Sequence, residues 1–509
     1  MAALPSTATV AVFGAGAMGA GIAQIAAQAG HRVQLFDARF NAAEEGRKKI
    51  GQALSSLAAK GRLSNEAAKG ALARIDVVHA LGDVASARLV IEAIVEDLEA
   101  KRDLFRKLEV VVARDAILAT NTSSLSVTAL SAGLQHPGRV VGMHFFNPAP
   151  LLPLVEVVSG LGTDPDVARA IYDTAQAWGK IPVHASSTPG FIVNRCARPF
   201  YAEALRLLAE RAADPATLDA VMREAGGFRM GPFELMDLIG HDINFAVTRS
   251  VWEAHFHDAR FTPSVYQQEL VSAGHLGRKS GRGVYDYAEG AQKPAPRTEP
   301  PRSGPARIVA YGDLRAANAL VDRIAALGVP VERHEPRPPF PTGVIAAGGA
   351  WLAMSDGRSA TSRSTDGVRD LVLFDLAYDY HATKRLAVSR ADSCSDAAYG
   401  AAVGLLQTAG IAVSPIDDVG GLPVIRTVAM LANEAADAVQ QGIASPRDID
   451  LAMQKGVNYP QGPLAWADAI GCDLVRETLV ALHAHYGDAR YRVSPLITRR
   501  CASRAPLAS

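Results

Sequence analysis

Cysteine is scarce in this chain, and neither sign of charge is in excess. The 509 residues include four cysteines, which lie far apart and form no CxxC pair. This spacing argues against a zinc site and against a disulfide framework, and it is typical of proteins in the reducing cytoplasm. Lysine plus arginine and aspartate plus glutamate number 52 each, so the formal net charge is zero. Without an overall positive field, the chain is not expected to bind nucleic acid or acidic lipid.

Charge is absent from residues 1–30, a stretch long enough to span a bilayer. Five glycines interrupt this stretch, however, and no basic region precedes it. A strand, a glycine turn and a buried helix explain it better than a signal or membrane segment, so we expect a soluble, cytoplasmic protein. Hydrophobic residues make up 49% of the chain, enough for several buried cores. At about 150 residues per domain, the length predicts three or four domains.

A proline-rich stretch at 288–306 divides the chain into two halves. Its composition cannot form a packed core, so we predict a linker. Residues 1–188 show apolar strands alternating with amphipathic helices, which is typical of a parallel sheet covered on both faces. Residues 189–287 show helical periodicity. After the linker, residues 307–414 show a weaker strand and helix pattern without a glycine fingerprint, and residues 415–505 are again helical.

The clearest strand signals fall in both halves of the chain. Short apolar runs bounded by turn residues indicate them. In the first half they are Val10–Phe13, Val33–Phe36, Leu89–Ile94, Ile117–Ala119, Val140–His144 and Leu154–Val158, and in the second half Arg307–Tyr311 and Leu371–Phe374. Helices are predicted at Arg198–Glu210 and Pro215–Glu224.

The two helical regions repeat one another. Seven residues recur at a constant offset of 231, which aligns roughly 50 residues without a gap. The pairs are Gly190/Gly421, Arg195/Arg426, Glu203/Glu434, Asp219/Asp450, Gly231/Gly462, Pro232/Pro463 and Gly240/Gly471. We therefore expect the second copy to pack against the first as an intrachain pseudo-dimer, with a separate tail domain as the alternative. A homodimer of whole chains through another surface is left open.

A glycine-rich turn follows the first predicted strand and has the sequence Gly14-Ala15-Gly16-Ala17-Met18-Gly19. Gly14 permits a tight turn, Gly16 lets the backbone approach a pyrophosphate, and Gly19 lets helix and strand pack closely. Free N–H groups at the start of the next helix would bind the phosphates. Asp37 ends the second strand, where a carboxylate accepts hydrogen bonds from ribose hydroxyls and repels a 2′-phosphate. The pattern predicts NAD binding, with Arg32 and Arg39 nearby as the features that favour NADP.

A histidine at the end of a predicted strand is the candidate general base. His144 lies in Gly142-Met-His-Phe-Phe-Asn-Pro148, at the side of the sheet where open α/β folds bind ligands. Glu156 on the next strand could hold the imidazole tautomer and raise its basicity. On the residues alone, a histidine beside two phenylalanines is more often a packed core residue. The segment from Asn121 to Ser124 is likewise more often an ordinary helix cap.

These residues resemble the L-3-hydroxyacyl-CoA dehydrogenases of β-oxidation. The resemblance covers residues 8–287 and rests on GAGAMGAGIAQ, IEAIVEDLEAK, NTSSL, GMHFFNPAP, LVEVV, TPGFIVNR and MGPFELMDLIG. It implies an α/β Rossmann-type NAD-binding domain followed by an all-α domain. In the second half it implies a degenerate α/β segment and a second copy of the all-α domain. The implied reaction is NAD-dependent oxidation of an L-3-hydroxyacyl-CoA to the 3-oxoacyl-CoA, without a metal.

The matched motifs also imply catalytic roles. His144 would be the base and Glu156 its partner, while Ser123 and Asn194 would hold the 3-oxygen of the substrate and the cofactor. In the second copy the position that matches Asn194 is Ile425, so that copy is expected to be catalytically silent.

Further contacts are implied for the cofactor and for CoA. Glu96, Lys101 and Asn147 match NAD-contacting positions together with the glycine turn, and Lys60 matches a lysine that meets the CoA phosphates. A serine that contacts CoA in the family is Ala53 here, which leaves the CoA contact less secure than the catalytic set.

The resemblance does not fix the acyl group, and two substrates remain candidates: 3-hydroxyadipyl-CoA, as in phenylacetate breakdown, and 3-hydroxybutyryl-CoA. Two alternative functions compete with this reading. One is a non-enzymatic NAD-binding protein on the same fold, and the other is a dehydrogenase of free β-hydroxy acids.

Overall fold

The computed structural model describes residues 2–336 and 343–509, which form two compact units. Unit 1 comprises Met1–Arg195 and Gln441–Val457, and unit 2 comprises Cys196–Gln440 and Asn458–Ser509. Residues 441–457 lie in the second helical region of the sequence analysis, yet they belong to unit 1. Among the described residues, none of the helices is long and apolar enough to cross a membrane.

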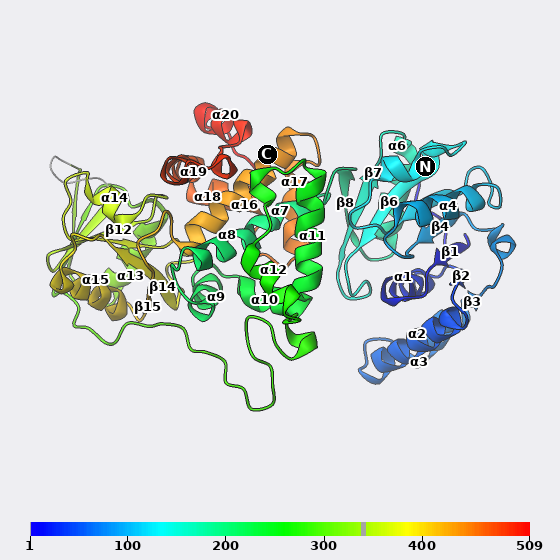
Figure 1. The fold of residues 1–509 in the computed structure, drawn as a ribbon, viewed down its shortest axis with the longest axis horizontal. Coiled ribbons are helices and arrows are strands. Elements are labelled where there is room, and N and C mark those ends of the chain that lie inside the picture. Colours follow the sequence, from blue (N-terminus) through cyan, green and yellow to red (C-terminus); the bar gives the residue numbers. More distant parts are fainter. Residues whose placement is uncertain (1, 337–342) are drawn as a thin grey trace. The chain divides into compact units, whose positions relative to one another are not determined.

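Unit 1 is built on an eight-stranded sheet, drawn in blue to cyan in Figure 1, with the order β3-β2-β1-β4-β5-β6-β7-β8. The strands are β1 Val10–Phe13, β2 Val33–Phe36, β3 Ile75–Val77, β4 Leu89–Glu92, β5 Ile117–Thr120, β6 Val140–Phe145, β7 Leu154–Ser159 and β8 Ile181–Ser186. The helices of unit 1 are α1 Ala17–Gln28, α2 Ala42–Ala59, α3 Asn65–Ala73, α4 Leu98–Glu109, α5 Val127–Ser131, α6 Pro165–Ala177 and α17 Pro446–Gly456, with α7 Val193–Cys196 at the boundary.

One face of this sheet forms a hydrophobic core with α1, α2 and α6. Met143 and Phe145 of β6 belong to this core, as do Val155 and Val157 of β7. Because successive side chains of a strand point to opposite faces, the residues between them lie on the other face of the sheet.

The sheet is parallel except at β6 and β7, which pair antiparallel. The sequence predicts a parallel sheet throughout, and this pair is the difference. Only residues 146–153 connect the two strands. A parallel crossover needs about a dozen residues or more, so this connection can only turn the chain back.

The edge of the sheet at β8 is covered by α17, which comes from the second half of the chain. The backbone N–H of Ser186 donates to the carbonyl of Ile443 at 2.8 Å, and its hydroxyl donates to the carbonyl of Gly442 at 3.0 Å. Arg195 Nη1 donates to Gln441 Oε1 at 2.8 Å across 246 residues of sequence. A segment far along the chain therefore completes unit 1.

Unit 2 contains the remaining parts of both helical regions and a second sheet (Figure 1). Its helices are α8 Arg198–Ala209, α9 Pro215–Glu224, α10 Pro232–Ile239, α11 His241–Ala254, α12 Val265–Ser272, α13 Asn318–Ala326, α14 Ala360–Ser364, α15 Asp396–Thr408, α16 Pro423–Gln440, α18 Pro463–Ile470, α19 Cys472–Tyr486 and α20 Pro495–Ser503. The strands are β9 Ile308–Tyr311, β10 Val331–His334, β11 Val344–Ala347, β12 Ala350–Met354, β13 Leu371–Phe374, β14 Arg385–Arg390 and β15 Ala412–Pro415.

The second sheet is mixed and has the order β10-β9-β11-β12-β13-β14-β15 among the described residues. The strands β11 and β12 form a hairpin whose turn is Gly348-Gly349, with φ of 58° and 91°. Positive φ values are open to glycine without strain, which makes this turn tight enough for antiparallel pairing. No glycine-rich helix start follows β9, in contrast to β1.

The two sheets receive matching backbone hydrogen bonds at the offset of 231. In unit 1, Ser186 donates to the carbonyl of Ile443 at 2.8 Å, and in unit 2, Asp417 donates to the carbonyl of Ala212 at 2.9 Å. In each case, the loop after the first long helix of one helical copy contacts the end of the last strand in the other half's sheet.

The first long helices of the two copies, α8 and α16, pack against each other in unit 2. Arg426 of α16 is fully buried and donates to Glu203 at 2.8 Å and to Glu210 at 2.9 Å. The Tyr491 hydroxyl also donates to Glu203, at 3.0 Å. A buried cation is tolerated because carboxylates and hydroxyls surround it.

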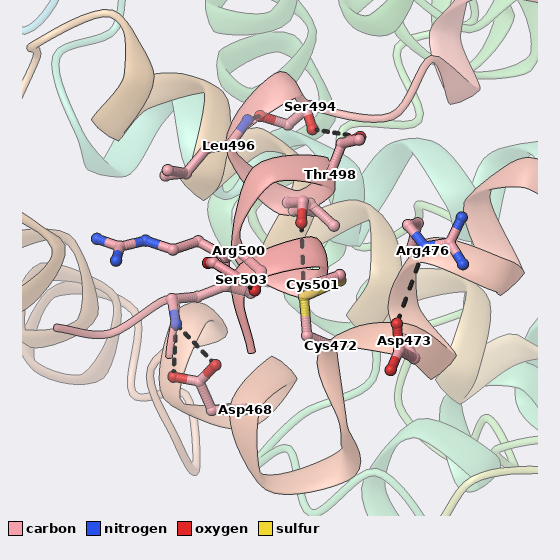
Figure 2. Close-up of a disulfide and its surroundings, with 12 residues drawn as sticks. Asp468, Cys472, Asp473, Arg476, Ser494, Leu496, Thr498, Arg500, Cys501 and Ser503 are labelled. Atoms are coloured by element: carbon pink, nitrogen blue, oxygen red, sulfur yellow. Dashed lines mark hydrogen bonds and ion pairs between the residues drawn. A yellow bond between two sulfur atoms is a disulfide. The ribbon is translucent and has the colours of Figure 1, made fainter. Parts of the chain in front are cut away.

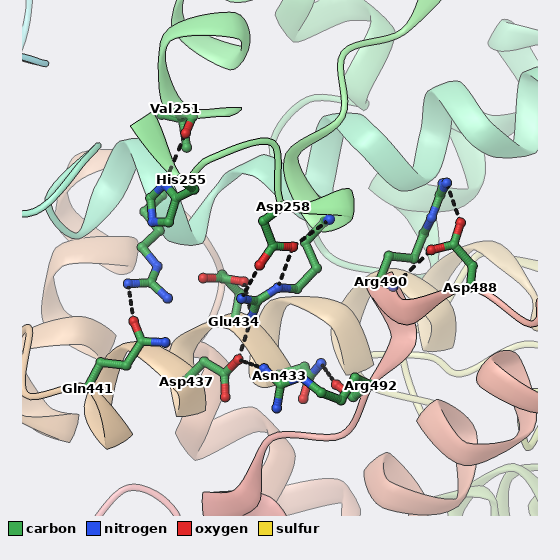
Figure 3. Close-up of polar contacts among 12 residues, drawn as sticks. Val251, His255, Asp258, Asn433, Glu434, Asp437, Gln441, Asp488, Arg490 and Arg492 are labelled. Atoms are coloured by element: carbon green, nitrogen blue, oxygen red, sulfur yellow. Dashed lines mark hydrogen bonds and ion pairs between the residues drawn. The ribbon is translucent and has the colours of Figure 1, made fainter. Parts of the chain in front are cut away.

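A second buried polar cluster lies at Glu434 and Asp437 of α16 (Figure 3). Arg260, in the short helix η3 Ala259–Phe261, contacts Glu434 at 3.1 Å and also contacts Asp437. Arg492 reaches Asp437 at 2.6 Å. Acidic residues of one helical copy therefore bind a basic residue of the other.

Cys472 and Cys501 form a disulfide that joins the start of α19 to α20 (Figure 2). The sequence-based expectation of no disulfide is wrong for this pair. The two cysteines are 29 residues apart without a motif spacing, and only the packing of α19 on α20 brings them together. Cys196 and Cys394 are buried and lie outside this disulfide.

Candidate active site

His144 and Glu156 face each other across the antiparallel pair β6 and β7. Direct cross-strand neighbours have their Cβ atoms about 5 Å apart, so the register alone brings the two side chains together. His144 Nδ1 lies 2.6 Å from Glu156 Oε2. His144 is 5% exposed and Glu156 is fully buried. Because a carboxylate accepts hydrogen bonds, this contact favours the tautomer of the neutral imidazole in which Nδ1 carries the proton and Nε2 has the lone pair.

The second oxygen of Glu156 fixes the start of α7. Glu156 Oε1 accepts hydrogen bonds from the backbone N–H groups of Ile192 and Val193 at 3.0 and 2.9 Å. One carboxylate therefore positions both His144 and the segment that carries Asn194.

The imidazole of His144 is enclosed by two aromatic rings. The ring of Phe146 lies 4.5 Å from it and the ring of Phe191 lies 5.8 Å from it, centroid to centroid. Next to it, Asn121 Oδ1 accepts the backbone N–H of Phe145 at 2.8 Å, which ties the end of β6 to the end of β5. The imidazole of His144 therefore has largely apolar surroundings.

Ser123 and Asn194 lie together beside this dyad's strands. Asn194 Nδ2 donates to the Ser123 carbonyl at 3.5 Å, and Glu96 Oε1 accepts the Ser123 N–H at 3.0 Å. Thr122 donates its hydroxyl to the same Glu96 oxygen at 2.5 Å. The sequence-predicted residues Ser123, Glu96 and Asn194 are thus in one hydrogen-bonded loop.

Lys101 is a buried cation that joins two glutamates. Its Nζ lies 2.6 Å from Glu92 and 3.2 Å from Glu96. Burial raises the pKa of Glu96, but Lys101 and the hydroxyl of Thr122 outweigh it and hold the pKa below its ordinary value. Glu96 therefore stays ionised and accepts hydrogen bonds from the loop that carries Ser123.

The turn after β1 has the geometry of a phosphate-binding loop. Gly14 has φ of 97°, and a Cβ there would lie 2.4 Å from the carbonyl oxygen of Ala93. At Gly19 a Cβ would lie 1.8 Å from the carbonyl of Gly14, so only glycine lets α1 approach β1. A Cβ on Gly16 would meet no atom within 4 Å, which leaves space for a ligand at the backbone. The first turn of α1 has no side-chain cap and no acidic residue, so its N–H groups can bind a pyrophosphate.

Asp37 lies beside this turn. Its Oδ2 accepts the N–H of Ala15 at 2.8 Å, and Arg39 binds the same carboxylate through Nε and Nη2 at 3.1 and 3.0 Å. Burial raises the pKa of Asp37, but the hydrogen bonds from Arg39 and Ala15 hold it below its ordinary value. The carboxylate is therefore ionised and lies beside the glycine turn.

Two sequence-predicted residues stand apart from these contacts. Asn147 follows β6 at a cis peptide bond to Pro148. Lys60 is exposed at the end of α2, and Ala53 is exposed on the same helix. In the part of the chain that the structure describes, neither a hydrogen bond nor an ion pair links Lys60 to the residues around His144. No cluster of three or more metal-ligating side chains occurs there either.

Family models match most of the chain. The model described as 3-hydroxyacyl-CoA dehydrogenase, NAD binding domain, matches residues 9–188, and the C-terminal domain model of 3-hydroxyacyl-CoA dehydrogenase matches 190–287 and again 421–506. The chain belongs to the 3-hydroxyacyl-CoA dehydrogenase family. The family resemblance, the fold class and the NAD cofactor inferred from the sequence are confirmed.

Relatives of known name agree with this membership. The 3-hydroxyadipyl-CoA dehydrogenase of Escherichia coli K12 is 43% identical over 492 residues, 97% of each chain. The mitochondrial hydroxyacyl-coenzyme A dehydrogenase of Sus scrofa is 39% identical and covers 55% of this chain and 90% of its own. Among solved structures, a 3-hydroxybutyryl-CoA dehydrogenase from Escherichia coli K12 superposes with a TM-score of 0.89 at 42% identity, covering 98% of each chain.

The second half of this family member has neither a histidine nor a glutamate at the positions that match His144 and Glu156. Residues 352–419 match a model described as a 3-hydroxybutyryl-CoA dehydrogenase reduced Rossmann-fold domain. Its strands β13 and β14 pair as β6 and β7 do, with Leu373 opposite Ser389. At the offset of 231, Asp375 occupies the place of His144 and Ala387 the place of Glu156. Asp375 is fully buried and accepts the N–H groups of Val424 and Ile425.

Some contributors to the site were not predicted from the sequence. Gly456 of α17 packs so closely that a Cβ there would lie 2.7 Å from Leu154 and 3.1 Å from Val193. Leu154 is in the same strand as Glu156, and Val193 directly precedes Asn194. Phe191 is part of the matched motif TPGFIVNR, but its ring contact with His144 depends on the turn before α7. No local sequence signal marks α17 as part of unit 1.

Proposed function

We propose that the chain oxidises an L-3-hydroxyacyl-CoA to the 3-oxoacyl-CoA with NAD, using His144 as the general base. The observation that carries this proposal is the buried dyad, with His144 Nδ1 at 2.6 Å from Glu156. The family membership supports the reaction class.

In the proposed mechanism, His144 Nε2 accepts the proton of the substrate's 3-hydroxyl group. Bound NAD supplies the nicotinamide that takes the hydride from C3. As the imidazole gains its proton, Glu156 stabilises the positive charge across a short hydrogen bond between two buried side chains. Since Glu156 is itself held by two backbone N–H groups, its charge does not need to reorganise.

Ser123 and Asn194 are proposed to orient the 3-oxygen. The Asn194 amide donates to the backbone carbonyl of Ser123 at 3.5 Å, so the two residues are neighbours, and the Ser123 hydroxyl and the Asn194 amide can both donate to an oxygen. Asn147, Lys101 and Glu96 are proposed on the cofactor side, with Gly14, Gly16, Ala17, Met18, Gly19 and Asp37. Lys60 is proposed to bind the CoA phosphates from the exposed end of α2.

The acyl group is proposed to be that of 3-hydroxyadipyl-CoA or of 3-hydroxybutyryl-CoA, as the names of the similar Escherichia coli proteins suggest. The deciding measurement is a steady-state comparison of both substrates and of longer acyl-CoAs by NADH absorbance, with free 3-hydroxybutyrate as the control. We expect turnover of CoA esters and none of the free acid. NAD binding without any turnover would instead support a non-enzymatic NAD-binding protein.

We propose that the two helical regions, 189–287 and 415–505, form an intrachain pseudo-dimer joined by the linker at 288–306, and that 307–414 and 415–505 are catalytically silent. The buried pairing of Arg426 with Glu203 and Glu210 supports the first point. The residues Asp375, Ala387 and Ile425 at the catalytic positions support the second. A cytoplasmic location is proposed from the low cysteine content and from the thiols of Cys196 and Cys394, and the disulfide is the observation against it.

A further inference from the structure

Unit 2 by itself forms a mostly apolar pocket of about 270 Å³ between α8, α11, η3 and α12. All the described residues that line it belong to unit 2. Its apolar walls include Ala202 and Leu205 of α8, Phe261 of η3 and Val265 of α12. Val265 is 73% exposed, so an apolar side chain faces solvent at this pocket. Apolar surface around a concave site is typical of ligand binding.

One wall of the pocket carries the guanidinium of Arg198, which is 6% exposed. Its Nη1 donates to Thr248 Oγ1 at 3.0 Å, and its guanidinium lies 4.9 Å from the ring of Tyr201. Its Nε is buried and has no hydrogen-bond partner among the described residues. No aspartate or glutamate of the described chain pairs with it, so burial lowers the pKa of Arg198 below the ordinary arginine value.

The other arginines of the pocket are neutralised by carboxylates. Arg206 binds Glu203, Arg260 binds Asp258 at 2.8 Å, and Arg490 binds Asp488 at 2.6 Å, the last pair being drawn in Figure 3. Arg198 therefore differs from every other cation that lines the pocket in the described part of the chain.

The second helical copy offers an internal comparison for this wall. At the offset of 231, Ala429 of α16 matches Arg198, and Leu479 of α19 matches Thr248. Both matching residues are fully buried. Apolar side chains therefore fill these two positions in one copy, while a cation and a hydroxyl fill them in the other. The packing of the repeated helices does not explain why Arg198 is a cation.

A buried cation without a counter-charge destabilises the fold, because the charge is removed from water without compensation. A bound anion would supply the missing charge. Since Nη1 is engaged by Thr248, the side of the guanidinium formed by Nε and Nη2 remains for a ligand. A carboxylate fits this side, because it accepts two parallel hydrogen bonds from a guanidinium. One unneutralised cation in apolar walls favours a monoanion with an apolar body over a polyanion.

We propose that this pocket is a binding site for a free carboxylic acid with an apolar tail. Arg198 binds the carboxylate, and the apolar walls at Ala202, Leu205 and Phe261 contact the tail. Because unit 2 supplies all of these groups, binding requires neither NAD nor turnover. The test below is therefore independent of the proposed reaction.

The test compares two ligands of equal length that differ in charge. Hexanoate and hexanamide are titrated into the full chain by calorimetry, without cofactor or CoA ester. We expect hexanoate to bind once per chain and hexanamide to bind much more weakly. Arg198→Met should weaken hexanoate binding at least about 30-fold, as truncation of one partner in a buried charge pair does. Arg198→Lys keeps the charge but loses the parallel pair, so its affinity should be intermediate.

Two further variants separate the pocket from a general charge effect. Arg249→Met removes an exposed arginine on α11 that is paired with Glu253, and it should bind hexanoate as the wild type does. Ala202→Phe keeps Arg198 but fills the pocket, and it should lose hexanoate binding. Without ligand, Arg198→Met should melt at or above the wild-type Tm, since it removes an uncompensated buried charge.

Three results would overturn the site. They are no binding of hexanoate to the wild type, equal affinity for hexanoate and hexanamide, and unchanged hexanoate affinity in Arg198→Met. If Arg198→Met does not fold, Arg198→Lys and Ala202→Phe decide in its place, and unchanged hexanoate affinity in both rejects the proposal.

Discussion

At the scale of single residues, Glu156 organises the candidate site through both of its oxygens. One oxygen holds the His144 imidazole, and the other holds the N–H groups of Ile192 and Val193 at the start of α7. Because Asn194 follows directly, Glu156 supports both the candidate base and the residue proposed to orient the 3-oxygen. Loss of this carboxylate would therefore displace both the His144 imidazole and the start of α7, so a change at His144 isolates the role of the imidazole better.

Replacing His144 by glutamine is expected to lower kcat by about 10²–10⁴, the usual contribution of a general base. Glutamine can still occupy the space between Phe146 and Phe191, so NAD binding should persist. The measurements are kcat by NADH absorbance and NADH affinity by fluorescence. A fall in kcat of less than about threefold with every substrate tried would show that His144 is not the base.

Replacing Asp37 by alanine is expected to weaken NAD binding and to relax discrimination against NADP. The variant loses the ribose acceptor and also frees Arg39, which is paired with Asp37 and could then bind a 2′-phosphate. Dissociation constants for both cofactors measure the effect, and Asp37→Ala combined with Arg39→Ala is the control that should lose the gain for NADP. Unchanged affinities for both cofactors would contradict the ribose role.

At the scale of elements, the sequence predicted those parts of the fold that depend on local pattern. The bounds of β1, β2, β13 and α9 agree with prediction to the residue. The antiparallel course of β7 was missed because it depends on the length of a connection rather than on strand pattern. The hairpin of β11 and β12 was missed as well, since its short apolar strands lie outside any motif.

The candidate site likewise has a part that the sequence predicted and a part that it did not. The motifs named His144, Glu156, Ser123 and Asn194, and the structure brings them close through the register of β6 with β7 and the loop after β5. The close packing of Gly456 against Leu154 and Val193, by contrast, comes from α17. The sequence of this helix does not indicate that it belongs to unit 1. Long-range packing of this kind is not encoded in a local window.

The strand β13 ends at a carboxyl group whose titration should be visible in stability. Burial raises the pKa of Asp375 from 3.8 to about 7. The folded state then binds more protons than the unfolded state between these values, so this group makes stability fall as pH rises from 3.8 to about 7. Above about pH 7 the loss of folding stability caused by this group stays constant, and below pH 3.8 there is no such loss.

Asp375→Asn should therefore gain Tm relative to the wild type as the pH is raised from about 4 to about 7, with no further gain above. Subtracting the two Tm curves cancels the titration of all other groups. A difference in Tm that stays constant across this range would show that Asp375 titrates normally.

At the scale of the whole molecule, the first half of the chain needs segments of the second half to complete unit 1 and to cover α8. A fragment of residues 1–300 lacks 441–457, which complete unit 1, and lacks α16, which packs on α8. We expect it to dimerise or aggregate and to lose most of its activity, as judged by light scattering and NADH formation. The matched control is the full chain cut inside the linker after folding, which should keep its activity. A soluble, fully active 1–300 monomer would refute the pseudo-dimer.

Because residues 441–457 belong to unit 1, this unit can be completed only after most of the second half has been synthesised. The hydrogen-bonded partners Arg195 and Gln441 are 246 residues apart. At about 5–20 residues per second, the ribosome needs roughly 10 to 50 seconds between them. During that interval the edge at β8 and the segment beside Asn194 are made but uncovered. The nascent chain therefore exposes this edge while its candidate catalytic residues are already present and α17, which packs beside them, has not yet been synthesised.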